Sequence, residues 1–263
     1  MTERGLFIVV DGLDGVGKGE VERAIITYEQ KLGKAVFDSV AFSKANAKGL
    51  PELIDFWNPP ETYYNTVITA EPTYEGIGHS IRFEIIVRDG REYSAETEIQ
   101  AYSLNRLIQM KRVVIPAISN RLNVVQSRCF SATLTYQSLR AEDEGKNPEE
   151  ARIRILEHEG NKLQLEYRPD LLIIPRIKNI EELMKRIEAR KGSAKDDNSI
   201  FDNPEFQKRL NESYQSLWLK ELFESRGTVV KYLDASISPE STREQAVNIY
   251  RDFLTSKQSP KVK

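Results

Sequence analysis

Short apolar runs alternate with amphipathic stretches along most of the chain. The first run, residues 6–10 (LFIVV), is continuous, and a glycine-rich turn and then apolar residues at helical spacing follow it up to Gly33. A strand that is apolar throughout, rather than alternating, indicates burial on both faces, as in a parallel sheet covered by helices. Further short strands are predicted at residues 66–69, 122–126, 171–174 and 228–233. The pattern therefore predicts an α/β fold with helices on both faces of a parallel sheet.

Helical spacing fills much of the chain between these strands. Helices are predicted over residues 94–118, with Pro116 ending or bending the helix, and over residues 140–159, 180–190 and 241–254. Residues 37–65 mix prolines with aromatic residues, and we interpret them as an insertion that carries some packed structure. Residues 191–199 (KGSAKDDNS) are predicted to form a polar loop.

Composition and charge set limits on partners and location. The 263 residues carry a formal net charge of −2, which favours neither nucleic acid nor a membrane surface as a partner. No apolar run approaches the roughly 18 residues of a membrane span, and the first run is too short for a signal sequence. The single cysteine, Cys129, excludes an internal disulfide. We therefore expect one cytoplasmic domain over residues 1–263, with no nucleic-acid and no membrane partner.

A phosphate-binding loop follows the first strand. The stretch FIVVDGLDGVGKGE matches G-x-x-x-x-G-K from Gly12 to Lys18 and has Gly19 where the motif has Ser or Thr. Backbone N–H groups and a helix N-terminus cradle phosphate oxygens in such a loop, and the lysine offsets their charge. The predicted ATP-binding residues are Gly12, Leu13, Asp14, Gly15, Val16, Gly17, Lys18 and Gly19.

Six motifs in order resemble those of one family. FIVVDGLDGVGK, AEPTYEGIGHSIR, AYSLNR, QSRCFSATLTYQ, RPDLLII and YLDASISPE resemble the successive motifs of thymidylate kinases, which are P-loop nucleoside monophosphate kinases. The resemblance implies a P-loop NTPase three-layer sandwich with a short lid. It also implies ATP-dependent phosphorylation of a deoxynucleoside monophosphate, with dTMP as the expected acceptor, ATP and Mg2+ as cofactors, and a homodimer.

The resemblance assigns roles to individual side chains. Asp14 falls where the family contacts the deoxyribose 3′-hydroxyl, Tyr102 where an aromatic ring stacks on thymine, and Arg106 where an arginine bonds the base. Arg128 matches an arginine that holds the monophosphate, and Tyr136 a residue that crowds the 2′ position. From spacing alone, Tyr102 and Arg106 would instead be a core tyrosine and a surface arginine. The expected substrate-binding set is Asp14, Glu71, Tyr102, Arg106, Arg128, Thr133, Tyr136 and Gln137.

A lid is expected near residues 186–202, because this region lies where the family has a lid that closes over ATP. Because Val16 occupies a loop position that can be basic, a cation for the transition state would come from the lid, which offers Arg186, Arg190, Lys191 and Lys195. We expect Lys18, Arg128 and Arg190 to act in catalysis. A run of charge is more often a solvated face, so no single lid cation is required by the sequence.

Four departures from the family pattern bear on catalysis. Gly19 removes a hydroxyl that ligates magnesium, Ser127 replaces the aspartate before Arg128, Ala70 replaces an arginine, and Arg176 replaces an acidic residue. Magnesium needs few protein ligands, so Asp11 and Glu71 are candidate metal ligands. Two alternatives stay open at this point: a non-catalytic nucleotide-binding regulatory protein on the same fold, and a kinase for a different small acceptor.

Overall fold

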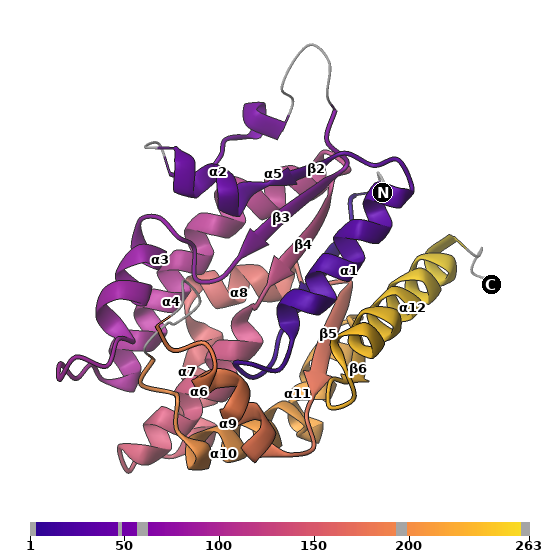
Figure 1. The fold of residues 1–263 in the computed structure, drawn as a ribbon. Helices are drawn as coiled ribbons and strands as arrows, with labels where there is room; N and C mark the ends of the chain where they lie inside the picture. The colour runs from indigo at the N-terminus through magenta and orange to yellow at the C-terminus, as the bar shows by residue number, and fades with distance from the viewer. Residues whose placement is uncertain (1–3, 47–48, 57–62, 193–198, 259–263) are drawn as a thin grey trace.

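A single parallel sheet forms the centre of the molecule. The computed structural model describes residues 4–46, 49–56, 63–192 and 199–258. Six strands run parallel in the order β2-β3-β4-β1-β5-β6 (Figure 1). They are β1 (Phe7–Val10), β2 (Val36–Asp38), β3 (Thr66–Ala70), β4 (Asn123–Ser127), β5 (Leu171–Arg176) and β6 (Val229–Asp234). The apolar β1 is fully buried, as its continuous pattern predicted.

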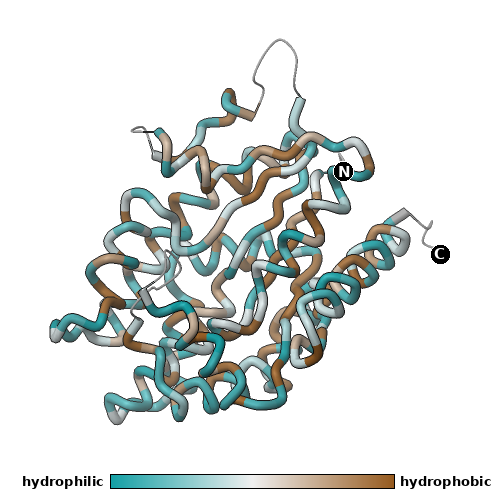
Figure 2. Tube along the Cα trace, viewed as in Figure 1, coloured by the Kyte–Doolittle hydropathy of each residue, from teal (hydrophilic) through white to brown (hydrophobic). Residues whose placement is uncertain are grey.

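Helices cover both faces of this sheet, which confirms the three-layer arrangement. α1 packs against α12 on one face, and α4 packs against α6 and α8 on the other (Figure 1). Hydrophobic residues concentrate along the strands between these layers (Figure 2). No helix within the described residues is long and apolar enough to cross a membrane. The helices are α1 (Lys18–Lys31), α2 (Ser39–Ala45), α3 (Ile77–Ser80), α4 (Ala95–Gln109), α5 (Ile115–Ser119), α6 (Phe130–Asp143), α7 (Pro148–Glu157), α8 (Glu159–Glu166), α9 (Ile180–Glu188), α10 (Pro204–Tyr214), α11 (Leu217–Glu224) and α12 (Pro239–Gln258).

The edge strand β2 was not predicted from the sequence. It has three residues, and the Asp38 side chain then accepts hydrogen bonds from the Val40 and Ala41 N–H groups and starts α2. A strand of three residues is too short to show the alternation of apolar and polar residues from which a strand is predicted. The aromatic residues that follow do pack, because the Phe37 ring centroid lies 5.2 Å from that of Phe56 and 5.1 Å from that of Tyr64. The expected packed structure in this segment is therefore confirmed.

Two predicted helices are divided in the structure. The helix expected over residues 94–118 becomes α4, a π-helical turn at Met110–Val114 and α5, so it changes register before Pro116, which has no N–H to donate. The helix expected over residues 140–159 is interrupted where Gly145 takes a φ of 75° and Asn147 caps α7. α7 also buries Ala151 and Ile155, so this segment is not fully solvated as expected.

Helices α10 and α11 were missed altogether. The signal for α10 was present, because the Asn203 side chain caps the helix, Pro204 follows, and Phe206, Leu210 and Tyr214 recur every fourth residue. All three of these apolar side chains are buried. The polar loop expected at residues 191–199 lies mostly outside the described residues.

Candidate active site

The phosphate loop joins the buried end of β1 to the start of α1. Three of its glycines, Gly12, Gly15 and Gly17, have φ values of 141°, 76° and 104°. Residues with side chains rarely adopt such values, so the glycine spacing is what permits this tight loop. α9 covers the loop closely, because a Cβ added to Gly15 would lie 3.1 Å from Ile187 Cγ1.

Lys18 folds back over this loop. Its Nζ donates hydrogen bonds to the carbonyl oxygens of Gly12 (3.0 Å) and Leu13 (2.6 Å) and lies 3.7 Å from Oδ1 of Asp14. Burial, reinforced by the positive charge of Arg128, lowers the pKa of Lys18 to about 8. The motif lysine is thus held at the loop, where its charge is sensitive to an added anion.

Asp14, Arg128 and Tyr136 form a connected group between the loop and α6. Arg128 Nη2 pairs with the Asp14 carboxylate, and the Tyr136 hydroxyl donates to Asp14 Oδ2 at 2.9 Å. Burial alone would raise the pKa of Asp14, but Arg128 and Lys18 outweigh it and hold that pKa far below its ordinary value. Arg128 also has a φ of 65°, which is uncommon for a residue other than glycine.

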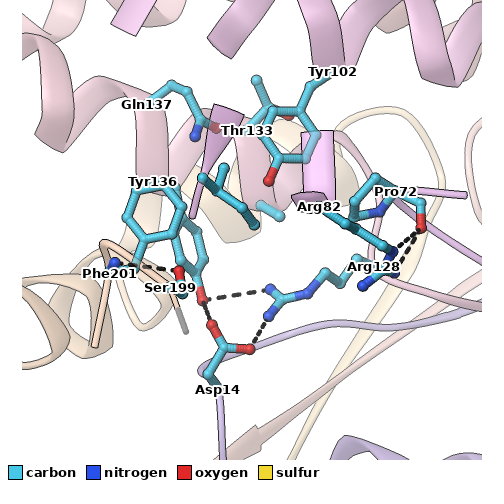
Figure 3. A pocket seen from close by; sticks show the side chains of 12 residues that line it. Asp14, Pro72, Arg82, Tyr102, Arg128, Thr133, Tyr136, Gln137, Ser199 and Phe201 are labelled. Atoms are coloured by element: carbon cyan, nitrogen blue, oxygen red, sulfur yellow. Dashed lines mark hydrogen bonds and ion pairs between the residues drawn. The ribbon is translucent and has the colours of Figure 1, made fainter. Parts of the chain in front are cut away.

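A pocket opens beside this group. Figure 3 shows Tyr102 and Arg82 on one side of it, Tyr136 and Phe201 on the other, and Asp14 with Arg128 below them. The Phe201 ring packs edge-on against Tyr136, with centroids 5.0 Å apart. The pocket is lined by Asp14, Pro72, Arg82, Ile86, Tyr102, Arg128, Ala132, Thr133, Tyr136, Gln137, Ser199 and Phe201. Six of the eight residues expected to bind the acceptor thus line one pocket.

Gln137 is held in place by a buried acid. Its Nε2 donates to Glu98 Oε2 at 3.1 Å, and Arg140 Nε donates to Glu98 Oε1 at 3.2 Å. Burial raises the pKa of Glu98, although Arg140 opposes that shift. Because one Gln137 N–H is already engaged, the amide presents a fixed orientation at the pocket.

Arg82 lines the pocket but was not predicted from the sequence as a site residue. Its Nη2 donates to the carbonyl oxygen of Pro72 at 2.6 Å, and its guanidinium carbon lies 4.1 Å from the centre of the Tyr74 ring. The available signal was the motif AEPTYEGIGHSIR, which ends at Arg82 and lacks an arginine at Ala70. The structure thus adds a second arginine beside Arg128.

Arg106 and Glu71 lie behind this pocket instead of lining it. Arg106 is 1% exposed and Glu71 is 3% exposed, and the Arg106 Nη2 lies 2.7 Å from Glu71 Oε2. Arg106 also donates to Asn161 and to Thr133, so its guanidinium is surrounded by protein acceptors. The amides of two buried glutamines donate to Glu71 Oε1: Gln126 at 2.9 Å and Gln164 at 3.0 Å.

Asp11 is also buried and fully hydrogen-bonded. Its Oδ1 accepts from the Gly12 N–H (2.7 Å) and the Tyr214 hydroxyl (2.9 Å), and its Oδ2 accepts from the Cys129 N–H and from Ser131. This carboxylate therefore ties the loop to α6 and α10. The metal-binding roles predicted for Asp11 and Glu71 stay predictions, because metal ligation would require these hydrogen bonds to break.

The expected lid cations differ in position. Arg190 Nη2 lies 3.3 Å from where a Gly15 Cβ would be, and Arg190 helps to lower the pKa of Asp14. Arg186 donates to the carbonyl oxygen of Ala235, and Lys191 pairs with Glu188 at 2.6 Å. Lys195 lies outside the described residues. Of the three described cations, Arg190 is thus the one placed over the phosphate loop.

The four departures from the family pattern have separate surroundings. Gly19 is exposed, and a Cβ there would meet nothing within 4 Å. Ala70 and Ser127 are paired at the carboxyl ends of β3 and β4. Arg176 stacks on Tyr232, with its guanidinium carbon 3.3 Å from the centre of the ring. Among the described residues, no group of three or more His, Cys, Asp or Glu side chains could hold a metal ion.

Comparisons with known proteins give one consistent family. The family model described as thymidylate kinase matches residues 59–246, which is more than half of the chain. A probable thymidylate kinase of Thermococcus gammatolerans is 23% identical over 258 residues, which cover 96% of this chain and 99% of the relative. A probable thymidylate kinase of Pyrococcus horikoshii is 31% identical over 143 residues, which cover 53% of this chain and 55% of the relative. The solved structure of thymidylate kinase from Candida albicans has a TM-score of 0.60 at 15% identity and covers 97% of this chain and 93% of that one. The chain belongs to the thymidylate kinase family.

Proposed function

We propose that this chain transfers the γ-phosphoryl group of ATP to dTMP. The observation that carries the proposal is the ion pair between Arg128 and Asp14, which connects the acceptor pocket directly to the phosphate loop. Phosphoryl transfer requires donor and acceptor phosphates to lie next to each other among positive charges. Membership of the thymidylate kinase family supports dTMP as the acceptor.

The pocket residues divide the work of holding the acceptor. Tyr102 offers an aromatic face for the base, and Gln137 offers an amide fixed by Glu98. Arg128 and Arg82 supply positive charge for a monophosphate, and a guanidinium suits bidentate contact with phosphate. Tyr136, which lines the same pocket, excludes a ribose 2′-hydroxyl in this proposal.

The donor side uses the loop and the lid. Lys18 and the backbone of the loop hold the ATP phosphates, and Arg190 neutralises charge that develops during transfer. A magnesium ion bound with ATP would offset the negative charge of the phosphates. The site fits such an ion, because Glu22 Oε1 is buried near Lys18 and has no hydrogen-bond partner among the described residues. The expected homodimer and cytoplasmic location remain predictions.

An ADP-release assay across the nucleoside monophosphates tests the proposal. We expect turnover that depends on ATP and magnesium and is fastest with dTMP, and Lys18→Ala serves as the inactive control. Turnover only with another acceptor would replace dTMP in the proposal. ATP binding without turnover on any acceptor would instead support the non-catalytic alternative.

A further inference from the structure

Helix α1 carries an acidic side chain that the phosphate-loop motif does not require. Glu22 lies four residues after Lys18, so both side chains share one face of the helix. Helical side chains lean toward the N-terminus, which brings the Glu22 carboxylate back toward the phosphate loop. Its electrostatic neighbours are consistent with this position, because they include Lys18, Arg128 and Asp11. Glu22 therefore lies beside the phosphate loop.

One oxygen of the Glu22 carboxylate has no hydrogen-bond partner in the part of the chain that the structure describes. Oε1 is shielded from solvent and makes no hydrogen bond with the described residues. Burial raises the pKa of Glu22, while the nearby Ser127 hydroxyl and Lys18 act to lower it. Unsatisfied buried polar atoms are costly and uncommon in folded proteins. An oxygen left in this state beside a ligand site is available to that ligand.

The neighbouring acid on the same helix shows the contrast. Glu20 accepts hydrogen bonds from Arg23 at 2.6 Å and from Arg243 at 2.5 Å, so both of its oxygens are used. Glu20 thus joins α1 to α12 on the outside of the helix. Glu22 is half-buried, and it has no arginine partner among the described hydrogen bonds and ion pairs.

A carboxylate in this place would repel the phosphates of ATP unless a cation stood between them. Magnesium is such a cation, and it prefers oxygen ligands and is commonly held by one or two carboxylates together with substrate phosphates. The usual sources of such oxygens are missing here, because Gly19 has no hydroxyl and Ser127 replaces an aspartate. The Ser127 hydroxyl is a hydrogen-bonding neighbour of the Glu22 carboxylate and acts to lower its pKa, while Oε1 stays without a partner among the described residues.

We propose that Glu22 supplies the protein carboxylate on the magnesium side of the ATP phosphates, in place of the groups missing at Gly19 and Ser127. The inference rests on the proposed kinase function. It explains how a phosphate loop without its hydroxyl retains a metal-side oxygen. It also gives a role to a buried oxygen that makes no hydrogen bond with the residues that the structure describes.

Calorimetric titration of ATP, with saturating magnesium and with EDTA, tests this role without depending on turnover. In the wild type, magnesium should tighten ATP binding. Glu22→Gln should reduce the magnesium-dependent gain in ATP affinity by a factor of about 10 to 100, the range seen when a group that supports a metal site is changed. Affinity in EDTA should stay the same or improve, because a repulsive charge has been removed. Glu20→Gln is the matched control, since it removes the same charge from the same helix turn, and its magnesium effect should equal that of the wild type.

A rescue variant completes the test. Gly19→Thr has open space for its side chain and should restore the magnesium effect in the Glu22→Gln protein. Equal weakening of ATP binding with and without magnesium in Glu22→Gln would overturn the inference and make Glu22 a structural residue. An unchanged magnesium effect would overturn it as well. If Glu22→Gln behaves as expected but no protein phosphorylates any acceptor, the inference stands and the proposed kinase function fails.

Discussion

The buried pair of Arg106 and Glu71 offers the sharpest test of how the acceptor site is built. Arg106→Met removes a guanidinium that contacts Glu71, Asn161 and Thr133 and leaves the Glu71 carboxylate in the interior without its cation. Breaking a pair that is 1% and 3% exposed should lower the free energy of unfolding by about 3–5 kcal/mol. The loss should appear as a lower urea midpoint with a similar slope.

A double-mutant cycle separates the pair from its surroundings. Glu71→Gln should cost a similar amount, and the double variant should lose clearly less than the sum of the two single variants, because neither charge is then left alone. Lys111 and Glu159 form the control pair, 3.4 Å apart and 60% and 71% exposed. Removing one partner of that exposed pair should change stability by about 1 kcal/mol or less.

The same variants also decide between two roles for Arg106. The family resemblance predicts a direct contact with the base, which would raise the KM for dTMP and leave stability nearly unchanged. The structure instead predicts a large loss of stability, because the guanidinium is satisfied by protein groups behind the pocket. A stability loss below about 1 kcal/mol in Arg106→Met, together with a raised KM for dTMP, would show that Arg106 contacts the base and that its pair with Glu71 contributes little to stability.

Further predictions concern the phosphate loop and the lid. Lys18→Ala should abolish ATP-dependent turnover, and wild-type rates of ADP release would contradict the phosphate-loop assignment. ATP binding just above pH 8 should take up protons, because phosphate favours the charged form of Lys18, whose pKa is lowered to about 8. Calorimetry in buffers of different ionisation enthalpy measures this proton uptake. Equal uptake near neutral pH, where Lys18 is already charged, would show that another group takes up the protons. Gly15→Ala should lower the free energy of unfolding by at least about 1–2 kcal/mol, because Gly15 has a φ of 76° and the new Cβ would lie 3.1 Å from Ile187 Cγ1. An unchanged urea midpoint would mean that α9 does not pack against the phosphate loop. Arg190→Ala should lower kcat about a thousandfold, whereas Lys191→Ala should keep a kcat near that of the wild type. Equal losses of kcat in the two variants would show that the position of the lid charge does not matter.

The sequence predicted those parts of the molecule that local patterns determine. Continuous apolar runs located five of the six strands, and glycine spacing located the phosphate loop. The three-residue β2 escaped, because its place in the sheet comes from pairing with β3 and not from its own pattern.

The limits at the site have a different cause. The motif register selected Asp14, Tyr102, Arg128 and Tyr136, and all four line one pocket, whereas their roles toward a substrate stay predictions. It could not show that Arg106 turns toward Glu71, since that depends on distant segments of the chain, which supply Asn161 and the two glutamine amides. Side-chain direction is a tertiary property, whereas the register of a motif is a local one.

The pairing of Arg128 with Asp14 has a consequence for how the two substrates influence each other. If the acceptor monophosphate binds Arg128, as we propose, it would weaken the attraction between Arg128 and Asp14, and the Asp14 charge would then act more strongly on Lys18 and on a phosphate beside it. We therefore expect donor and acceptor binding to be coupled through these shared charges. Such coupling is reciprocal, so the factor by which dTMP changes the affinity for ATP must equal the factor by which ATP changes the affinity for dTMP.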